Sequence, residues 1–373
     1  MLARFAFQTV GKIHFGADSL KVVAQEAAGL GRKALVIADR HALAPGGPAE
    51  TISRLCSESG VEVVRLDEPP AGEPDLESVE RARRLRAEAG CGVVVGLGGG
   101  SILDTAKAVA GLANEPAPLR EYFDGRAVAS SGVPWIAVPT TAGSGAEATP
   151  NAVLSDPARN VKQSIRDGRF LARVVIADPR LTVSCPPTVT ADSGTDALAQ
   201  AIESFTSLGS NPLTDALAFE AARLILHSLP AAVRDGSNLE ARSGMLLGSL
   251  LAGIALANAR LGTIHGLAHP LGIRWHIPHG RICAILLAPV MRFNRSVVGE
   301  KYDRLSALAG QPIIEHVERL CRELGIPADL KSLAITGEEV EWIVRESLPS
   351  GSLKMNPRPT TADDLRAILA LLI

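Results

Sequence analysis

The stretch GVVVGLGGGSILDTAKAVAGLA, residues 92–113, joins a short apolar run to a helical pattern through three consecutive glycines. An apolar run that ends in glycines before a helix is typical of a strand leading into a phosphate-binding turn, because glycine lets the backbone approach an anion. Ser101 stands where it could cap this helix, and Asp104 follows at the spacing of a capping box. Ser101 also replaces the last glycine of a GxGxxG pattern, so a tight turn without a ligand is the alternative.

Similar apolar runs lie on both sides of this stretch and alternate with helical patterns. They cover residues 33–40, 61–68, 133–141 and 173–181. This alternation predicts a parallel sheet with helices on both faces, as in Rossmann-like domains. A second small, hydroxyl-rich loop, PTTAGSGAEAT at 139–149, follows one of these runs. Two such loops at the carboxyl ends of parallel strands are suited to binding a dinucleotide.

The predicted secondary structure changes after the Pro186–Pro187 pair. From there on, long patterns with apolar residues at helical spacing follow one another with no strand between them. We therefore predict an α/β Rossmann-like dinucleotide-binding domain over residues 1–185. An all-helical domain over residues 186–373 would hold metal and substrate.

Composition excludes several classes of protein. The 373 residues are 46% hydrophobic and 21% charged with a net charge of −2, so no basic excess attracts nucleic acid or an anionic membrane. The five cysteines are scattered and never in CxxC spacing, which predicts neither a disulfide framework nor a thiolate metal site. We find no signal-peptide core and no uninterrupted apolar stretch long enough to cross a bilayer, and expect a soluble cytoplasmic protein.

Half of the eight histidines fall within LGTIHGLAHPLGIRWHIPHG, residues 261–280. Upstream, Asp196 and Gln200 are four residues apart and share one helix face. A carboxylate and imidazoles from separate segments make an oxygen and nitrogen ligand set suited to Fe(II), Zn(II) or Mn(II). The spacing does not say which of the four histidines would bind.

These motifs together resemble the iron-containing (group III) alcohol dehydrogenase family. GGGSILDTAKAVA is similar to the family's GGGSxxDxxK segment, PTTAGSGAEAT to PTTAGTGSEVT, and HGLAHPLGIRWHIPHG to HxxAHxLGxxxxxPHG. MNPRPTTADDL resembles the NPRPVT ending, and the likeness runs from about residue 10 to residue 372. It implies the two-domain fold shared with dehydroquinate synthase. The implied activity is NAD(P)-dependent hydride transfer between a small alcohol and its aldehyde or ketone, at a divalent-metal site in the interdomain cleft.

The resemblance also implies the cofactor-binding residues. These are Asp39, Gly98, Gly99, Gly100, Ser101, Asp104, Thr140, Thr141, Ser144, Lys162 and Leu181. Lys107 would support this site. Asp39 matches the residue that favours NAD over NADP, although its position alone also fits a solvated turn residue. NAD is therefore the expected cofactor, with NADP as the less favoured alternative.

Asp196, His265 and His279 fall on three of the family's four metal-ligand positions, and they would be catalytic through that metal. The fourth position carries Gln200 where the family has histidine. Because catalytic zinc needs only three protein ligands, we predict Fe²⁺ or Zn²⁺, with Gln200 as a distant fourth ligand or as a hydrogen-bonding neighbour. His269 resembles the family's non-ligand histidine near the substrate, which implies that it relays a proton or contacts the ribose.

Some alternatives stay open at this point. Gln200 makes a metal-free or catalytically silent NAD-binding relative conceivable, and the shared fold leaves room for a carbon–oxygen lyase like dehydroquinate synthase. Arg274 could pair with an anionic group on a small aldehyde substrate, or could be a surface residue. By family resemblance we expect a homodimer.

Overall fold

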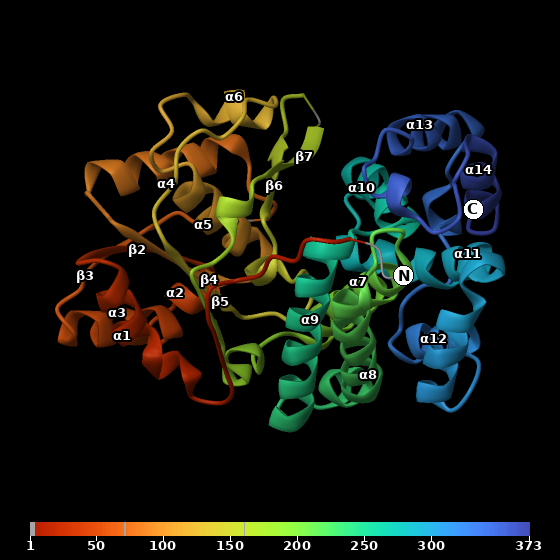
Figure 1. Cartoon of the computed structure of the whole chain (residues 1–373), viewed down its shortest axis with the longest axis horizontal. Helices are drawn as coiled ribbons and strands as arrows, with labels where there is room; N and C mark the ends of the chain where they lie inside the picture. The colour runs from red at the N-terminus through yellow and green to blue at the C-terminus, as the bar shows by residue number, and fades with distance from the viewer. Residues whose placement is uncertain (1–3, 71, 160) are drawn as a thin grey trace. The chain divides into compact units, whose positions relative to one another are not determined.

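The chain forms two compact units in the computed structural model, which describes residues 4–70, 72–159 and 161–373 (Figure 1). The α/β unit comprises Gln8–Thr141 and Gly145–Ser184. The helical unit comprises Cys185–Ile373, the short segment Ala142–Ser144 and the described residues before Gln8. The predicted combination of a Rossmann-like α/β part and an all-helical part is confirmed. The segment Ala142–Ser144 was not foreseen as part of the helical unit.

The α/β unit is built on a six-stranded parallel sheet in the order β1-β8-β5-β4-β2-β3. Its strands are β1 (Ile13–Phe15), β2 (Lys33–Ala38), β3 (Glu62–Arg65), β4 (Val93–Gly98), β5 (Trp135–Pro139) and β8 (Val174–Ala177). The central strands are buried on both faces, which explains why they are nearly continuous apolar runs. The order β3-β2-β4-β5-β8 places the topological switch point between β2 and β4.

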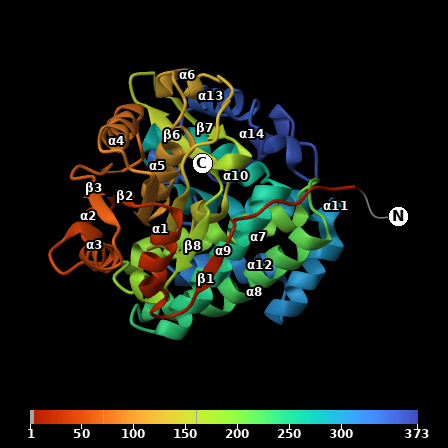
Figure 2. The ribbon, with the colours of Figure 1, turned by 60° about the vertical axis from the view of Figure 1, so that its left-hand side comes forward.

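Helices cover both faces of this sheet. They are α1 (Val23–Leu30), α2 (Arg40–Leu43), α3 (Pro48–Glu58), α4 (Leu76–Glu88), α5 (Gly100–Gly111) and α6 (Leu119–Phe123). Figures 1 and 2 show α1 and α3 on one face and α4 and α5 on the other. An antiparallel hairpin of β6 (Asn151–Asp156) and β7 (Val161–Arg166) was not predicted, because its polar residues give no long apolar run. Strand β1 was missed because its three residues are too few to form a recognisable apolar run.

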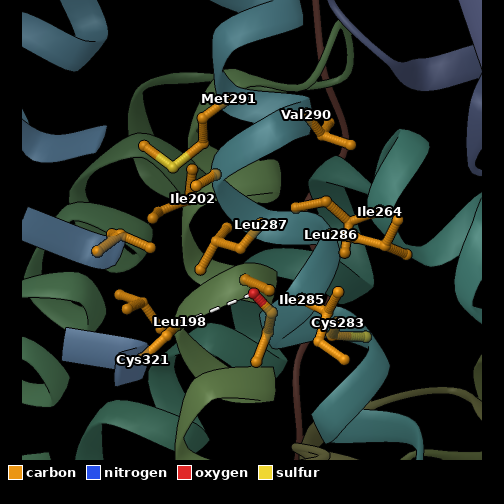
Figure 3. Close-up of a cluster of buried hydrophobic side chains, with 14 of the residues drawn as sticks. Leu198, Ile202, Ile264, Cys283, Ile285, Leu286, Leu287, Val290, Met291 and Cys321 are labelled. Atoms are coloured by element: carbon orange, nitrogen blue, oxygen red, sulfur yellow. Dashed lines mark hydrogen bonds between the residues drawn. The ribbon is translucent and has the colours of Figure 1, made fainter. Parts of the chain in front are cut away.

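The helical unit contains eight α-helices among the described residues. They are α7 (Pro187–Thr206), α8 (Pro212–Arg234), α9 (Leu239–Ala259), α10 (Thr263–Trp275), α11 (His279–Ala309), α12 (Ile313–Glu323), α13 (Gly337–Ser347) and α14 (Ala362–Ala370). Thr336 and Thr361 form capping boxes at α13 and α14, as the sequence indicated. The core of this unit consists of aliphatic side chains, and Figure 3 shows Leu198 and Ile202 of α7 beside Leu286, Leu287 and neighbours on α11.

Three helices of the helical unit are long and strongly apolar. By length and mean hydropathy α8, α9 and α11 are apolar enough to cross a membrane. The search of the sequence for uninterrupted apolar runs did not reveal them, because polar residues are interspersed in each helix. Within the structure 67% of the most apolar window of α9, 61% of that of α11 and 39% of that of α8 are buried.

Candidate active site

One face of α7 carries three polar side chains that are almost completely buried. Asp196, Gln200 and Glu203 stand at i, i+4 and i+7, the spacing that aligns side chains along one side of a helix, and each is at most 5% exposed. Burying two carboxylates this deeply is costly unless cations or hydrogen-bond donors compensate them. The partners of these three side chains therefore define the chemistry of the helical unit.

His265 is the main partner of Glu203. Its Nδ1 lies 2.6 Å from Glu203 Oε2, while Glu203 Oε1 accepts the backbone N–H of Ile264 at 2.7 Å. Because Glu203 engages Nδ1, the other ring nitrogen, Nε2, is the one that can bind a metal. This Nε2 lies 3.3 Å from Oδ1 of Asp196.

The NPRP stretch near the C-terminus fixes the start of α10, where His265 lies. Asn356 Oδ1 accepts the backbone N–H of Thr263 at 3.2 Å. A Cβ on Gly262 would lie only 2.7 Å from this oxygen and 2.9 Å from Glu203 Oε1, which explains the glycine at this position. The similarity of this stretch to the family ending thus has a structural reason, because the stretch holds a predicted ligand helix in place.

The first turn of α11 brings two further groups to Asp196. His279 is the first residue of this helix, and Cys283 follows four residues later on the same face. His279 Nε2 lies 4.0 Å from Asp196 Oδ1, and Cys283 Sγ lies 3.6 Å from His279 Nε2 and 3.8 Å from His265 Nε2. The four ligand atoms all lie within 4.8 Å of one another.

This cluster fits a divalent metal. Zinc bonds of 2.0–2.3 Å in a tetrahedron place neighbouring ligand atoms roughly 3.3–3.6 Å apart, close to the spacings seen here. Asp196 Oδ1 is buried, yet no described residue donates a hydrogen bond to it in proper geometry. Burial alone would raise the pKa of Asp196, but the hydrogen bond from His265 and the charges of His279 and His265 outweigh it and lower the pKa, so the buried carboxylate is ionised. An ionised carboxylate oxygen beside two imidazoles and a thiol is suited to a cation.

Gln200 is placed differently from the other predicted ligands. Its Nε2 donates to Asp196 Oδ2 at 3.0 Å, whereas both imidazoles approach the opposite oxygen, Oδ1. The amide therefore lies behind the carboxylate and orients it. The geometry favours Gln200 as a neighbour of the metal ligands, the second of the two roles that the sequence left open.

Cys283 was missed by sequence reasoning, which predicted no thiolate metal site because the cysteines are scattered. The signal that could have found it is the HxxxC spacing from His279, which puts a thiol one helical turn from a predicted ligand. Burial raises the pKa of the Cys283 thiol to about 12.

His269 and Arg274 lie further along α10. The His269 ring centroid is 5.5 Å from that of His279, so it is a neighbour of the cluster but outside it. Arg274 pairs with Glu339 at 2.9 Å and lies over the rings of Trp275 and Trp342. These contacts favour the structural role of Arg274 over recognition of an anionic substrate.

In the α/β unit, several predicted cofactor residues meet at the carboxyl edge of the sheet. The backbone N–H of Asp39 bonds Leu97 O at 3.2 Å, and that of Thr140 bonds Gly98 O at 3.1 Å. The Thr140 hydroxyl donates to Asp39 Oδ2 at 3.4 Å. A Cβ on Gly99 would lie 3.3 Å from the Thr141 hydroxyl. The ends of β2, β4 and β5 thus bring the predicted ribose and pyrophosphate residues together at the switch point.

The start of α5 corrects the expected role of Ser101. The helix begins at Gly100 with Gly99 as its N-cap, so Ser101 lies inside the first turn and does not cap it. The capping box with Asp104 is not formed either, because Asp104 is turned toward Lys107 Nζ at 3.0 Å and the backbone N–H of Val153 at 3.1 Å. The expectation failed because Gly99 is the N-cap, so the helix starts two residues earlier than a Ser101 cap would require.

Lys107 is fully buried and connects α5 to the segments that follow β5. Its Nζ also donates to Thr149 Oγ1 at 3.0 Å and to Asn151 O at 2.6 Å. Asp104 is therefore engaged in holding Lys107, and the predicted supporting role of Lys107 agrees with these contacts. Burial raises the pKa of Asp104 and lowers that of Lys107, because each loses hydration.

The remaining predicted cofactor residues have other surroundings. Lys162, on β7, is paired with Glu73. Leu181 lies in the 3₁₀ helix η4 (Pro179–Thr182) and packs against the core of the α/β unit. Ser144 belongs to the helical unit, next to Gly143, where an added Cβ would lie 2.5 Å from Ser193 Cβ.

Together, a switch-point loop suited to a dinucleotide and a buried Asp-His-His group suited to a metal define a metal-dependent nicotinamide oxidoreductase. Residues 11–179 match the family described as iron-containing alcohol dehydrogenase, and residues 190–373 match the C-terminal part of the same family. The chain belongs to the iron-containing alcohol dehydrogenase family. It is thus an oxidoreductase acting on alcohols and their carbonyl counterparts, as predicted, and the lyase and silent-protein alternatives are set aside.

Individual relatives span nearly the whole chain. Long-chain-alcohol dehydrogenase 1 of Geobacillus thermodenitrificans is 35% identical and covers 98% of this chain and 96% of its own length. NAD-dependent methanol dehydrogenase of Bacillus methanolicus is 33% identical with 91% of each chain covered. The crystal structure of sulfoacetaldehyde reductase from Bifidobacterium kashiwanohense in complex with NAD⁺ superposes with a TM-score of 0.92 at 30% identity, covering 99% of each chain.

Proposed function

We propose that this chain is an NAD-dependent enzyme that interconverts a small alcohol and its aldehyde or ketone, and that Asp196, His265 and His279 bind its divalent metal. The single observation that carries the proposal is the convergence of their ligand atoms on a buried carboxylate oxygen that accepts no hydrogen bond from the described residues. When bound, the metal polarises the substrate oxygen and the nicotinamide exchanges the hydride.

The remaining residues of the helical unit position this chemistry. Glu203 fixes the ring orientation of His265, and Gln200 fixes the carboxylate of Asp196. His269, beside His279, would relay the proton between the alcohol oxygen and solvent. Asp196 and His265 are both at most 5% exposed, so water is kept away from the metal ligands.

NAD is the proposed cofactor because Asp39 stands at the carboxyl end of β2. Its carboxylate oxygens accept hydrogen bonds from the Ala42 N–H and the Thr140 hydroxyl and can accept more. They can therefore also bind ribose hydroxyls, and their charge would repel a 2′-phosphate. The proposed contacts of the cofactor are the eleven residues expected from the family resemblance. The names of the methanol dehydrogenase and of the sulfoacetaldehyde reductase complex support NAD. We further propose that the protein is a homodimer in the cytoplasm.

The test is metal analysis of protein purified without chelator, paired with NADH oxidation over a panel of small aldehydes. We expect about one divalent ion per chain, loss of aldehyde reduction on chelation, and recovery on adding metal. Aldehyde reduction at an undiminished rate in protein without metal would overturn the metal assignment.

A further inference from the structure

The position at which the family signature supplies a fourth metal-ligating histidine carries Gln200, and its amide is bound to the far oxygen of Asp196. On the near side, the remaining corner of the cluster is taken by sulfur. We propose that Cys283 is the fourth protein ligand, which makes this an Asp-His-His-Cys site that prefers zinc to iron. This inference rests on the proposed function, because it concerns the same metal.

Distances around Cys283 support direct ligation. Its Sγ lies 3.6 Å and 3.8 Å from the Nε2 atoms of His279 and His265, and Asp196 Oδ1 lies 3.3 Å and 4.0 Å from His265 and His279. These four edges of a tetrahedron agree to within about half an ångström with those of a Zn²⁺ site, for which Zn–N and Zn–S bonds are roughly 2.0 and 2.3 Å.

The orientation of His265 also suits a shared metal. Its Nδ1 is engaged by Glu203, so Nε2 is the ring nitrogen that faces Asp196 Oδ1 and Cys283 Sγ. A divalent ion among these atoms would contact all three, and the thiol proton would leave to solvent as the Cys283 sulfur binds.

A purely structural role for Cys283 is the main alternative. Its side chain is fully buried in the aliphatic core of the helical unit, and Figure 3 shows it beside Ile285 and Leu286 on α11. Cys321 is buried in the same core at 9% exposure, and the contact described for its sulfur is to a backbone carbonyl, Ala284 O, at 3.9 Å. The approach to two imidazole nitrogens distinguishes Cys283 from this ordinary core cysteine.

The ligand set determines which metal is preferred. Thiolate and imidazole ligands select zinc and other borderline or soft ions, whereas oxygen-rich sets suit harder ones. Catalytic zinc sometimes expands to five ligands, so a zinc ion held by Asp196, His265, His279 and Cys283 would still have a position for the substrate oxygen. The sulfur of Cys283 on α11 thus compensates for the family histidine that Gln200 on α7 replaces.

The experiment uses cobalt as a spectroscopic probe and zinc competition as an affinity measurement. The full-length protein and its Cys283→Ser, Cys283→Ala, Gln200→Ala and Cys321→Ser variants are stripped and reloaded with Co²⁺. We expect a near-ultraviolet thiolate-to-cobalt charge-transfer band in the parent, in Gln200→Ala and in Cys321→Ser, and its loss in both Cys283 variants. Zinc affinity, measured against a competing chelator, should fall by more than about 100-fold in the Cys283 variants and by roughly 10–100-fold in Gln200→Ala, whose amide only orients a ligand.

The outcomes separate this inference from the proposed function. Co²⁺ bound in the parent without a charge-transfer band, or zinc affinity unchanged in Cys283→Ser, would overturn Cys283 as a ligand and leave the Asp-His-His site standing. Failure of the parent to bind any divalent ion would overturn both. Circular dichroism of each variant establishes that it is folded, and Cys283→Ser, which is nearly isosteric, covers the case in which Cys283→Ala is unstable.

Discussion

Glu203 Oε2 and His265 Nδ1 lie 2.6 Å apart, and both side chains are at most 5% exposed. This carboxylate–imidazole pair sets the tautomer of the ring and thereby directs Nε2 at Asp196. Such partners of metal-ligating histidines typically contribute 10–100-fold to metal affinity, although they never touch the ion. Glu203, on α7, therefore supports the metal site through His265 without binding the metal itself.

Glu203→Gln should weaken metal binding by roughly 10–100-fold, because a neutral amide holds the Nδ1 proton less firmly than a carboxylate. Zinc affinity against a competing chelator is the measurement. Glu220→Gln on the exposed surface of α8 is the matched control, since that carboxylate pairs only with Arg223 among the contacts described. An affinity equal to that of the control would show that Glu203 does not orient His265.

Asp39→Asn should shift cofactor preference from NAD toward NADP. The asparagine still accepts the Ala42 N–H as N-cap of α2, but it loses the charge that favours ribose hydroxyls and repels a 2′-phosphate. The loss of one charge-assisted hydrogen bond, about 1.5–3 kcal/mol, corresponds to roughly a 10–100-fold lower kcat/KM with NAD. Steady-state kinetics with both cofactors is the measurement, and an unchanged NAD to NADP ratio would contradict the role of Asp39.

Much of this fold could be predicted because its strongest signals are local. The central strands are buried on both faces, so their β-branched apolar runs are visible in the sequence, whereas the polar hairpin of β6 and β7 is not. Start signals of α13 and α14 were visible because threonine and an acidic residue three positions later cap a helix directly.

The site was only partly predictable because its members come from three helices. Spacing and family resemblance identified Asp196, His265 and His279, and the structure brings these three together. Cys283 lies on the same helix face as His279 at HxxxC spacing, and the packing of α11 against α7 brings its sulfur into the cluster. Ser101 failed as a cap for a local reason, since Gly99 already takes that position.

Gly98→Ala should impair both folding and cofactor binding. An added Cβ would lie 2.7 Å from the Ile102 side chain at the start of α5, so either the strand or the helix must shift. Overpacking of this kind costs about 1–3 kcal/mol, and the shift would displace the helix N-terminus proposed to hold the pyrophosphate. Urea unfolding and NAD titration are the measurements. Gly92→Ala is the matched control, because a Cβ there meets nothing within 4 Å; equal behaviour of the two variants would argue against a tight turn.

Glu147 is a buried carboxyl group whose ionisation should make the stability of the protein depend on pH. It lies in the 3₁₀ helix η2 (Ala146–Ala148), is 2% exposed, and its Oε1 has no hydrogen-bond partner among the described residues. Burial raises the pKa of this carboxyl from 4.5 to about 7. The protonated form is therefore favoured in the folded state, and its contribution to stability is fully present below pH 4.5 and lost as the pH rises through about 7.

Glu147→Gln should remove this loss, because the amide stays neutral at every pH. The free energy of unfolding of the parent should fall relative to the variant by about 3 kcal/mol between pH 4.5 and 7, from a shift of roughly 2.5 pKa units at 1.36 kcal/mol each. Urea unfolding across this pH range is the measurement. Glu121→Gln, at an exposed carboxylate paired with Arg126, should leave the pH profile of the parent unchanged. Parallel profiles of the parent and Glu147→Gln would mean that the Glu147 carboxyl is ionised at neutral pH and has found a partner in solution.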